Sequence, residues 1–163
     1  MIDKDSLRKK VRAQRQQYHA TIVQSDIDDQ IYQRWQLLSQ EFDVNNRIIA
    51  GYKAQGSELN IDKLLALLST TNTITYPLDN QIGFGMEPDI ILVPLLAFDN
   101  EGHRLGQGQG YYDLALYNLK KFKKIIAVGI GYECQKLDKI PVCDKDYTLD
   151  YVLTPITIIR VKK

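Results

Sequence analysis

Two runs of consecutive apolar residues constrain the fold of this chain more than any other feature: IILV at residues 90–93 and IIAV at residues 125–128. A strand with one face in water alternates apolar and polar side chains, whereas a strand covered on both faces is apolar throughout. Both runs are also rich in β-branched side chains, which favour strands. The sequence therefore predicts a parallel sheet with helices on both of its faces.

Shorter segments with strand or helix patterns alternate along the chain, as this architecture requires. Runs rich in β-branched residues and bounded by turn residues predict strands at residues 47–52, 73–76, 89–93, 124–128 and 151–154. Helices are expected at residues 5–18, 25–40 and 61–68, and from Tyr111 onward. Ser25 with Asp28 is the expected capping box of the second helix, and Asn60 the N-cap of the third. We expect a single domain, residues 1–163, with a three-layer α/β/α architecture, a mostly parallel, Rossmann-like sheet and an N-terminal helical extension.

Charge and cysteine content disfavour several classes of protein. The net charge of +1 gives the chain as a whole no attraction for nucleic acid or anionic lipid. Cys134 and Cys143 form no C-x-x-C pair, and with only two histidines a zinc site of His and Cys ligands is disfavoured. The first 18 residues are charged throughout, and no apolar run is long enough to cross a membrane. We therefore expect a cytoplasmic, zinc-free protein with no membrane partner.

The segment most suggestive of chemistry, residues 94–113, follows one predicted strand and leads into a helix. Ligands bind at this place in open α/β sheets. Gly106, Gly108 and Gly110 alternate within it, so the backbone can present N–H groups to a phosphate without obstructing Cβ atoms. The segment matches neither a Walker A motif nor G-x-G-x-x-G. A crossover loop that only makes tight turns explains the three glycines about equally well.

Two charged residues beside the glycines favour the phosphate site. Arg104 can bind phosphate oxygens with its planar guanidinium, and Asp113 beside bound phosphates is explained mainly as a ligand of Mg²⁺. The sequence thus favours a site for a polyphosphate and Mg²⁺. By residue type alone, the basic side chains of the first helix and the lysines of residues 120–124 indicate solvated faces.

Three pieces of the sequence follow one pattern, in order. They are K-x-x-L-R at residues 4–8, V-P-x-x-A-F-D…G-x-R-L-G-x-G-x-G-Y-Y-D at residues 93–113, and a looser piece that includes Tyr132, Gln135, Pro141, Asp146 and Asp150. Together they resemble the 5-formyltetrahydrofolate cyclo-ligase family, also called 5,10-methenyltetrahydrofolate synthetases. The middle piece is the most specific of the three.

The resemblance implies an ATP-driven closure of 5-formyltetrahydrofolate to 5,10-methenyltetrahydrofolate, with ADP and phosphate as products. It implies Arg8 and Arg104 as catalytic residues, and Asp113 and Asp146 as ligands of Mg²⁺. Glu58 and Tyr112 are implied to contact the folate. The residues implied at the ATP site are Lys4, Arg8, Arg104, Leu105, Gly106, Gln107, Gly108, Gln109, Gly110, Tyr111 and Tyr112.

One departure from the family pattern concerns residues 78–86. Family members run on for several dozen residues here, where this chain has nine, so we expect weak folate binding. Two other functions stay open: a shortened paralogue that binds ATP without cyclo-ligase activity, and a nucleic-acid accessory protein with a basic first helix. No aromatic residues interleave with the basic ones, which disfavours the second. The expected partners are ATP and 5-formyltetrahydrofolate, and the expected state is a monomer.

Overall fold

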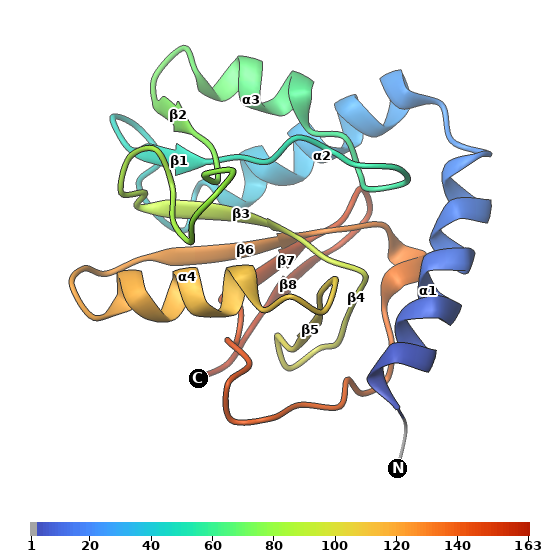
Figure 1. Cartoon of the computed structure of the whole chain (residues 1–163). Coiled ribbons are helices and arrows are strands. Elements are labelled where there is room, and N and C mark those ends of the chain that lie inside the picture. The colour runs from blue at the N-terminus through green and yellow to red at the C-terminus, as the bar shows by residue number, and fades with distance from the viewer. Residues whose placement is uncertain (1–2) are drawn as a thin grey trace.

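The computed structural model describes residues 3–163 and has a twisted sheet at its centre (Figure 1). Its strands are β1 (Ile48–Ala50), β2 (Thr73–Thr75), β3 (Ile90–Pro94), β6 (Ile126–Ile130), β7 (Tyr151–Leu153) and β8 (Ile158–Arg160). The strand order is β2-β1-β3-β6-β7-β8. All neighbouring strands are parallel except β8, which pairs antiparallel with β7. The expected mostly parallel sheet is confirmed.

The two apolar runs form the central pair of strands, β3 and β6. Their register joins Ile90 to Ile126 and Pro94 to Ile130. Alternate side chains of β3 enter different core clusters: Leu92 packs on one face of the sheet and Val93 on the other. The prediction that these strands are covered on both faces is therefore confirmed.

Helices lie on both faces of the sheet, which gives the three expected layers (Figure 1). On one face, α2 (Gln24–Leu38) and α3 (Asp62–Leu68) bury an apolar stripe that includes Trp35 and Leu64. On the other face, α4 (Tyr111–Lys120) buries Leu116. The first helix, α1 (Lys4–His19), lies near the carboxyl end of β3 and packs against the short helix η1 (Glu133–Gln135). None of the helices within residues 3–163 has the length and apolar character needed to cross a bilayer.

The expected N-caps of the second and third helices are wrong. Val23 is the N-cap of α2, and Asp28 accepts a hydrogen bond from the Gln24 side chain at 2.8 Å instead of forming a capping box. Ile61 is the N-cap of α3. Asn60 lies one residue earlier, where its side chain still accepts the Asp62 N–H at 2.8 Å. Asn60 therefore satisfies a backbone N–H of the first turn of α3 from the position before the cap, whereas Asp28 binds only a side chain.

Three of the strands were not predicted from the sequence. β4 (Ala97–Phe98) and β5 (Arg104–Leu105) form a small antiparallel hairpin inside the predicted ligand segment. With two residues each, they are too short to show a strand periodicity. The third is the edge strand β8. The lysines of residues 120–124 are largely solvated, as expected, although Lys123 pairs with Asp89 at 2.8 Å.

Candidate active site

A cavity of about 480 Å³ lies beside the carboxyl end of β3, bounded by α1, the glycine segment and the loops after β1 and β2. This edge of an open α/β sheet is the usual place for a ligand. The cavity is lined by Lys4, Arg8, Tyr52, Lys53, Gln55, Glu58, Tyr76, Pro77, Asp79, Pro94, Leu95, residues 104–113 and Asp146. Every site residue that the sequence analysis named is therefore in one cavity, although the three pieces of the pattern are far apart in the chain.

The glycines of the segment are required by backbone shape and by two arginines. Gly108 and Gly110 have φ angles of 104° and 70°, which side chains with a Cβ rarely adopt. A Cβ on Gly106 would come within 2.7 Å of Nη1 of Arg104, and one on Gly108 within 3.3 Å of Cζ of Arg8. The alternating glycines thus let two guanidinium groups lie directly against the loop, which a simple tight turn does not require.

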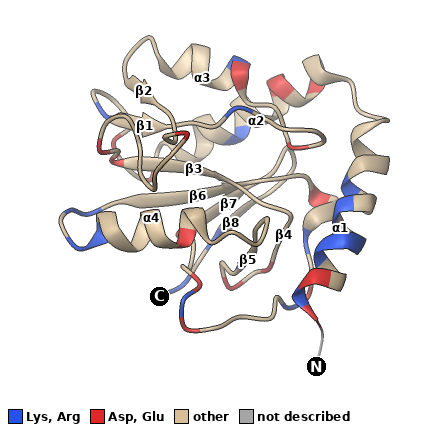
Figure 2. Ribbon diagram, viewed as in Figure 1, with Lys and Arg blue, Asp and Glu red and all other residues tan. Residues whose placement is uncertain are grey.

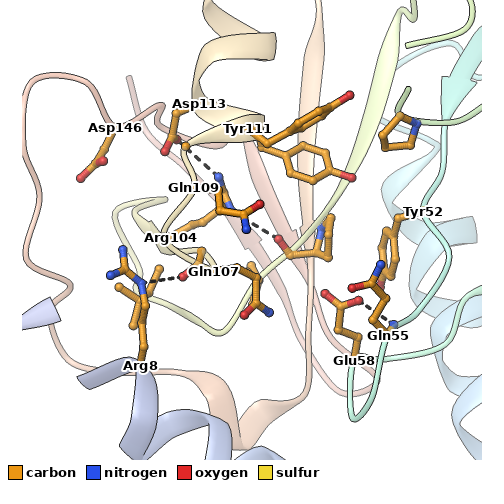
Figure 3. A pocket seen from close by; sticks show the side chains of 18 of the residues that line it. Arg8, Tyr52, Gln55, Glu58, Arg104, Gln107, Gln109, Tyr111, Asp113 and Asp146 are labelled. Carbon is orange, nitrogen blue, oxygen red and sulfur yellow. Dashed lines mark hydrogen bonds and ion pairs between the residues drawn. The ribbon is translucent and has the colours of Figure 1, made fainter. Parts of the chain in front are cut away.

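Lys and Arg residues take up much of α1 (Figure 2), and two of them, Lys4 and Arg8, line this cavity (Figure 3 shows Arg8). Lys4 pairs with Asp146 at 2.8 Å, the Arg8 Nε donates to the Gly106 carbonyl at 2.9 Å, and Arg12 donates to the Gln107 side chain at 2.8 Å. The expectation of a solvated face is wrong for these three residues. Their spacing of four residues, which puts them on one side of a helix, was the available signal for Arg12.

Arg15 is a second residue that the sequence analysis missed. Its side chain is buried, and it donates to the Ser57 hydroxyl at 2.9 Å and to the Leu95 carbonyl at 3.1 Å. Burial lowers the pKa of Arg15, while the nearby Glu58 carboxylate raises it. Arg15 therefore connects α1 to the loop that carries Glu58. Residue type gives no hint of this, because arginines are mostly exposed.

Arg104 is buried in the cavity wall with few good hydrogen bonds (Figure 3). Its Nη2 lies 3.5 Å from Asp113, its Nη1 lies 3.4 Å from the Pro94 carbonyl, and its Nε has no partner among the described residues. Burial lowers the pKa of Arg104, and Asp113 opposes that effect. A buried guanidinium with an unpaired N–H group gains more from an incoming anion than a solvated one.

Asp113 and Asp146 each retain an oxygen atom that no protein group binds within residues 3–163. The Asp113 Oδ1 accepts the Tyr147 N–H at 2.9 Å, and the Asp146 Oδ2 accepts the Cys143 N–H at 2.9 Å as well as Lys4. Burial opposes ionisation of Asp146, but the hydrogen bonds from Lys4 and Cys143 lower its pKa overall. Residues 3–163 contain no cluster of three potential metal ligands. Two neighbouring carboxylates fit Mg²⁺, which takes its other ligands from phosphates and water.

Glu58 lies across the cavity from Arg8 and Asp113, beside Tyr52 and Gln55 (Figure 3). Its side chain is largely buried, and Oε1 accepts the Gln55 N–H at 2.8 Å. Burial raises the pKa of Glu58, an effect that the Gln55 N–H and Arg15 reduce. The cavity therefore has a cationic half at the glycine segment and a second half with an acidic group and aromatic walls.

Glu58→Gln is expected to raise the melting temperature at about pH 7 and to leave it nearly unchanged at about pH 4. A raised carboxyl pKa favours the folded state below the usual pKa of glutamate, and this contribution is lost as the pH rises through the raised value. Glutamine is neutral at both pH values and can still accept the Gln55 N–H. Thermal unfolding of the exposed control Glu87→Gln should show no such difference, and a destabilised Glu58→Gln protein at neutral pH would contradict this account.

The parallel sheet, the glycine segment and the charged side chains around it define an α/β protein with a cavity of basic and acidic groups at the carboxyl edge of its sheet. A comparison with known families makes the assignment specific. The chain belongs to the 5-formyltetrahydrofolate cyclo-ligase family, whose model matches residues 66–155, more than half of the chain. The resemblance found in the sequence pattern is therefore confirmed.

Individual relatives agree with this assignment. The 5-formyltetrahydrofolate cyclo-ligase of Escherichia coli K12 is 43% identical over 67 residues, which are 41% of this chain and 36% of that protein. That of Mycolicibacterium smegmatis is 45% identical over 69 residues, 42% of this chain and 34% of that protein. These matches span only about a third of each curated relative.

A solved structure matches nearly the whole chain. The 5,10-methenyltetrahydrofolate synthetase of Mycoplasma pneumoniae has a TM-score of 0.74 and 25% identity, over 94% of this chain and 99% of that chain. The two chains are therefore similar in length. The length of this chain therefore does not distinguish it from the Mycoplasma pneumoniae synthetase.

Proposed function

We propose that this protein converts 5-formyltetrahydrofolate to 5,10-methenyltetrahydrofolate, with conversion of ATP to ADP and phosphate. The observation that carries the proposal is the single cavity, which brings the basic residues of α1 and the glycine segment to face Glu58. A cationic half suits a polyphosphate, and a half with aromatic walls suits a flat ring system. Family membership supports the same reaction.

In the proposed reaction the formyl oxygen attacks the γ-phosphorus and ADP leaves. N10 of the folate then attacks the activated carbon and gives up its proton, the ring closes, and the former formyl oxygen leaves as part of phosphate. The protein contributes position and charge stabilisation in such a transfer. Arg8 and Arg104 would hold the transferring phosphoryl group and Lys4 an outer phosphate, while Gly106, Gly108 and Gly110 let the backbone approach.

Asp113 and Asp146 would hold the Mg²⁺ that accompanies ATP. The ion would supply positive charge to the phosphates, and Lys4 would then move from Asp146 to a phosphate oxygen. We also propose that the protein is a cytoplasmic monomer whose partners are the small molecules ATP and 5-formyltetrahydrofolate. Two exposed, unpaired thiols, Cys134 and Cys143, support a reducing compartment.

The test is the absorbance of the methenyl product, followed after 5-formyltetrahydrofolate is mixed with the protein. We expect absorbance to grow only when ATP and Mg²⁺ are both present, with one ADP formed for each product molecule. No product at saturating folate, together with intact ATP binding, would favour a shortened paralogue without cyclo-ligase activity. A protein that binds neither ATP nor 5-formyltetrahydrofolate would contradict the whole proposal.

Asp113→Asn is expected to weaken the binding of a non-hydrolysable ATP analogue far more with Mg²⁺ than without it. The amide retains an oxygen for the Tyr147 N–H, but it loses the charge that favours a metal ligand. Titration calorimetry in Mg²⁺ and in a chelator measures the two affinities. An equal loss in both conditions would show that Asp113 acts on the protein structure and not through the metal.

A further inference from the structure

Tyr111, the first residue of α4, makes its polar contacts with the turn that follows β2. Its hydroxyl donates to the Gly83 carbonyl, accepts the Gly83 N–H at 3.2 Å, and lies 3.4 Å from the Leu78 carbonyl. Within residues 3–163, no other side chain hydrogen-bonds to the backbone of residues 77–84. One hydroxyl group therefore joins this turn to the helix that begins directly after the glycine segment.

The turn has few other connections to the fold. The Leu78 N–H donates to the Gly83 carbonyl at 2.9 Å, within the turn, and Pro77 forms a bridge with Phe84. Phe84 packs against Tyr112 with ring centroids 6.4 Å apart, while the tip at residues 79–82 is exposed. A segment with little buried apolar area opens easily unless a specific contact holds it.

The turn also forms part of the cavity wall. It lies on the side opposite the glycine segment, where the phosphates of ATP are proposed to bind. Pro77 and Asp79 line the cavity together with Tyr52, Tyr76 and Glu58. The carboxylates of Glu58 and Asp79 outnumber the one cation on this side, Lys53, which lies over the Tyr76 ring. This side therefore attracts a polyphosphate less than the glycine segment does, and its tyrosine and proline surfaces suit a flat aromatic ring. Figure 3 shows Tyr111 above Gln109 and Arg104, between the glycine segment and the wall that carries Tyr52.

We propose that Tyr111 is a positioning residue whose hydroxyl holds the turn of residues 77–84 as a wall for the folate, and thereby sets the affinity for that substrate. This inference rests on the proposed function for the identity of the ligand. It assigns the hydroxyl of Tyr111 to the folate side, although the family pattern places this residue at the ATP site. It also explains how the short segment of residues 78–86 can form a wall, since the Tyr111 hydroxyl connects its turn to α4.

Tyr111→Phe tests the inference because it removes one oxygen atom and leaves the ring in place. Hydrogen exchange should become faster in the amides of residues 77–86 and nowhere else. The KM for 5-formyltetrahydrofolate should rise about two- to tenfold, the effect of one lost hydrogen bond. The KM for ATP and kcat should change by less than about twofold, because the hydroxyl contacts neither the glycine segment nor Arg104.

Tyr32→Phe is the matched control, since Tyr32 lies on α2 and packs against the main core outside the cavity. It should change neither the exchange of the turn nor either KM. Unchanged hydrogen exchange in Tyr111→Phe would show that the hydroxyl does not hold the turn. A rise in the KM for ATP alone would show that the hydroxyl acts on nucleotide binding.

Binding measurements separate this inference from the proposed function. The Kd for 5-formyltetrahydrofolate, measured by equilibrium dialysis with a non-hydrolysable ATP analogue, should be weaker for Tyr111→Phe than for the wild type even if no turnover occurs. A wild-type protein that binds folate without turnover would overturn the cyclo-ligase proposal only. A wild-type protein that binds no folate would overturn both the proposed function and the ligand assigned to this wall.

Discussion

Arg8→Ala is expected to lower kcat/KM for methenyl formation by about 100- to 1,000-fold, the usual loss for one donor to a transition-state oxyanion. The Arg8 side chain is 18% exposed and lies against Gly108 in the cavity, held by the Gly106 carbonyl at 2.9 Å. Its remaining N–H groups can meet a phosphoryl group. Stability should fall by less than about 1 kcal/mol, because only one hydrogen bond to the loop and an exposed pair with Asp5 are lost.

Two variants make the result for Arg8 decisive. Lys9→Ala removes an exposed positive charge from the adjacent position of α1 and should leave turnover unchanged. Arg8→Lys keeps the charge but loses the planar fork, so most of the activity should still be lost. Chemical denaturation measures the free energy of unfolding in parallel. A variant that unfolds easily while its folded fraction is fully active would make Arg8 a structural residue.

Arg104→Met is expected to lower kcat/KM by a similar factor, about 100- to 1,000-fold, with a loss of stability below about 1 kcal/mol. The buried guanidinium has only long contacts, 3.5 Å to Asp113 and 3.4 Å to Pro94, and an unpaired Nε. The pair with Asp113 that is lost is long, and Asp113, which is 23% exposed, can be solvated without its cation, so only a small loss of stability is expected. Asp113 keeps its hydrogen bond from the Tyr147 N–H.

The combination of lost activity and retained stability distinguishes a ligand-binding arginine from a structural one. Turnover and denaturant unfolding should be compared with those of Lys63→Met, which removes an exposed charge from α3 and should change neither. If Arg104→Met destabilised the protein by several kcal/mol, the guanidinium would be essential to the fold. Its unpaired Nε would then not be evidence of a role in ligand binding.

The central sheet could be predicted from sequence because its strands leave a strong local signal. The apolar runs at residues 90–93 and 125–128 are short and rich in β-branched residues, which favours a doubly covered strand over a buried helix. The N-caps of α2 and α3 were missed because Val23 and Ile61 cap these helices without a side-chain hydrogen bond, which leaves no signal in the residue type. The hairpin of β4 and β5 was missed because its pairing is defined by contacts between residues and not by a local pattern.

The candidate site was predictable where the family pattern is specific, and not elsewhere. Arg104, Asp113 and the glycines are consecutive in sequence, so a motif contains them. Arg12 and Arg15 function through contacts with Gln107 and Ser57, which are far away in the chain, and only the fold brings these groups together. The connection between Tyr111 and the turn at residue 83 has the same origin.

The pairing of Lys4 with Asp146 joins positions separated by 142 residues. During synthesis on a ribosome, α1 emerges before the rest of the site, and Arg12 and Lys4 find their partners only when Gln107 and then Asp146 have followed. Closing so long a loop is slow compared with forming a helix. The nascent chain therefore carries an incomplete site almost to its last strand, and competence to bind nucleotide should arise in one late step of folding.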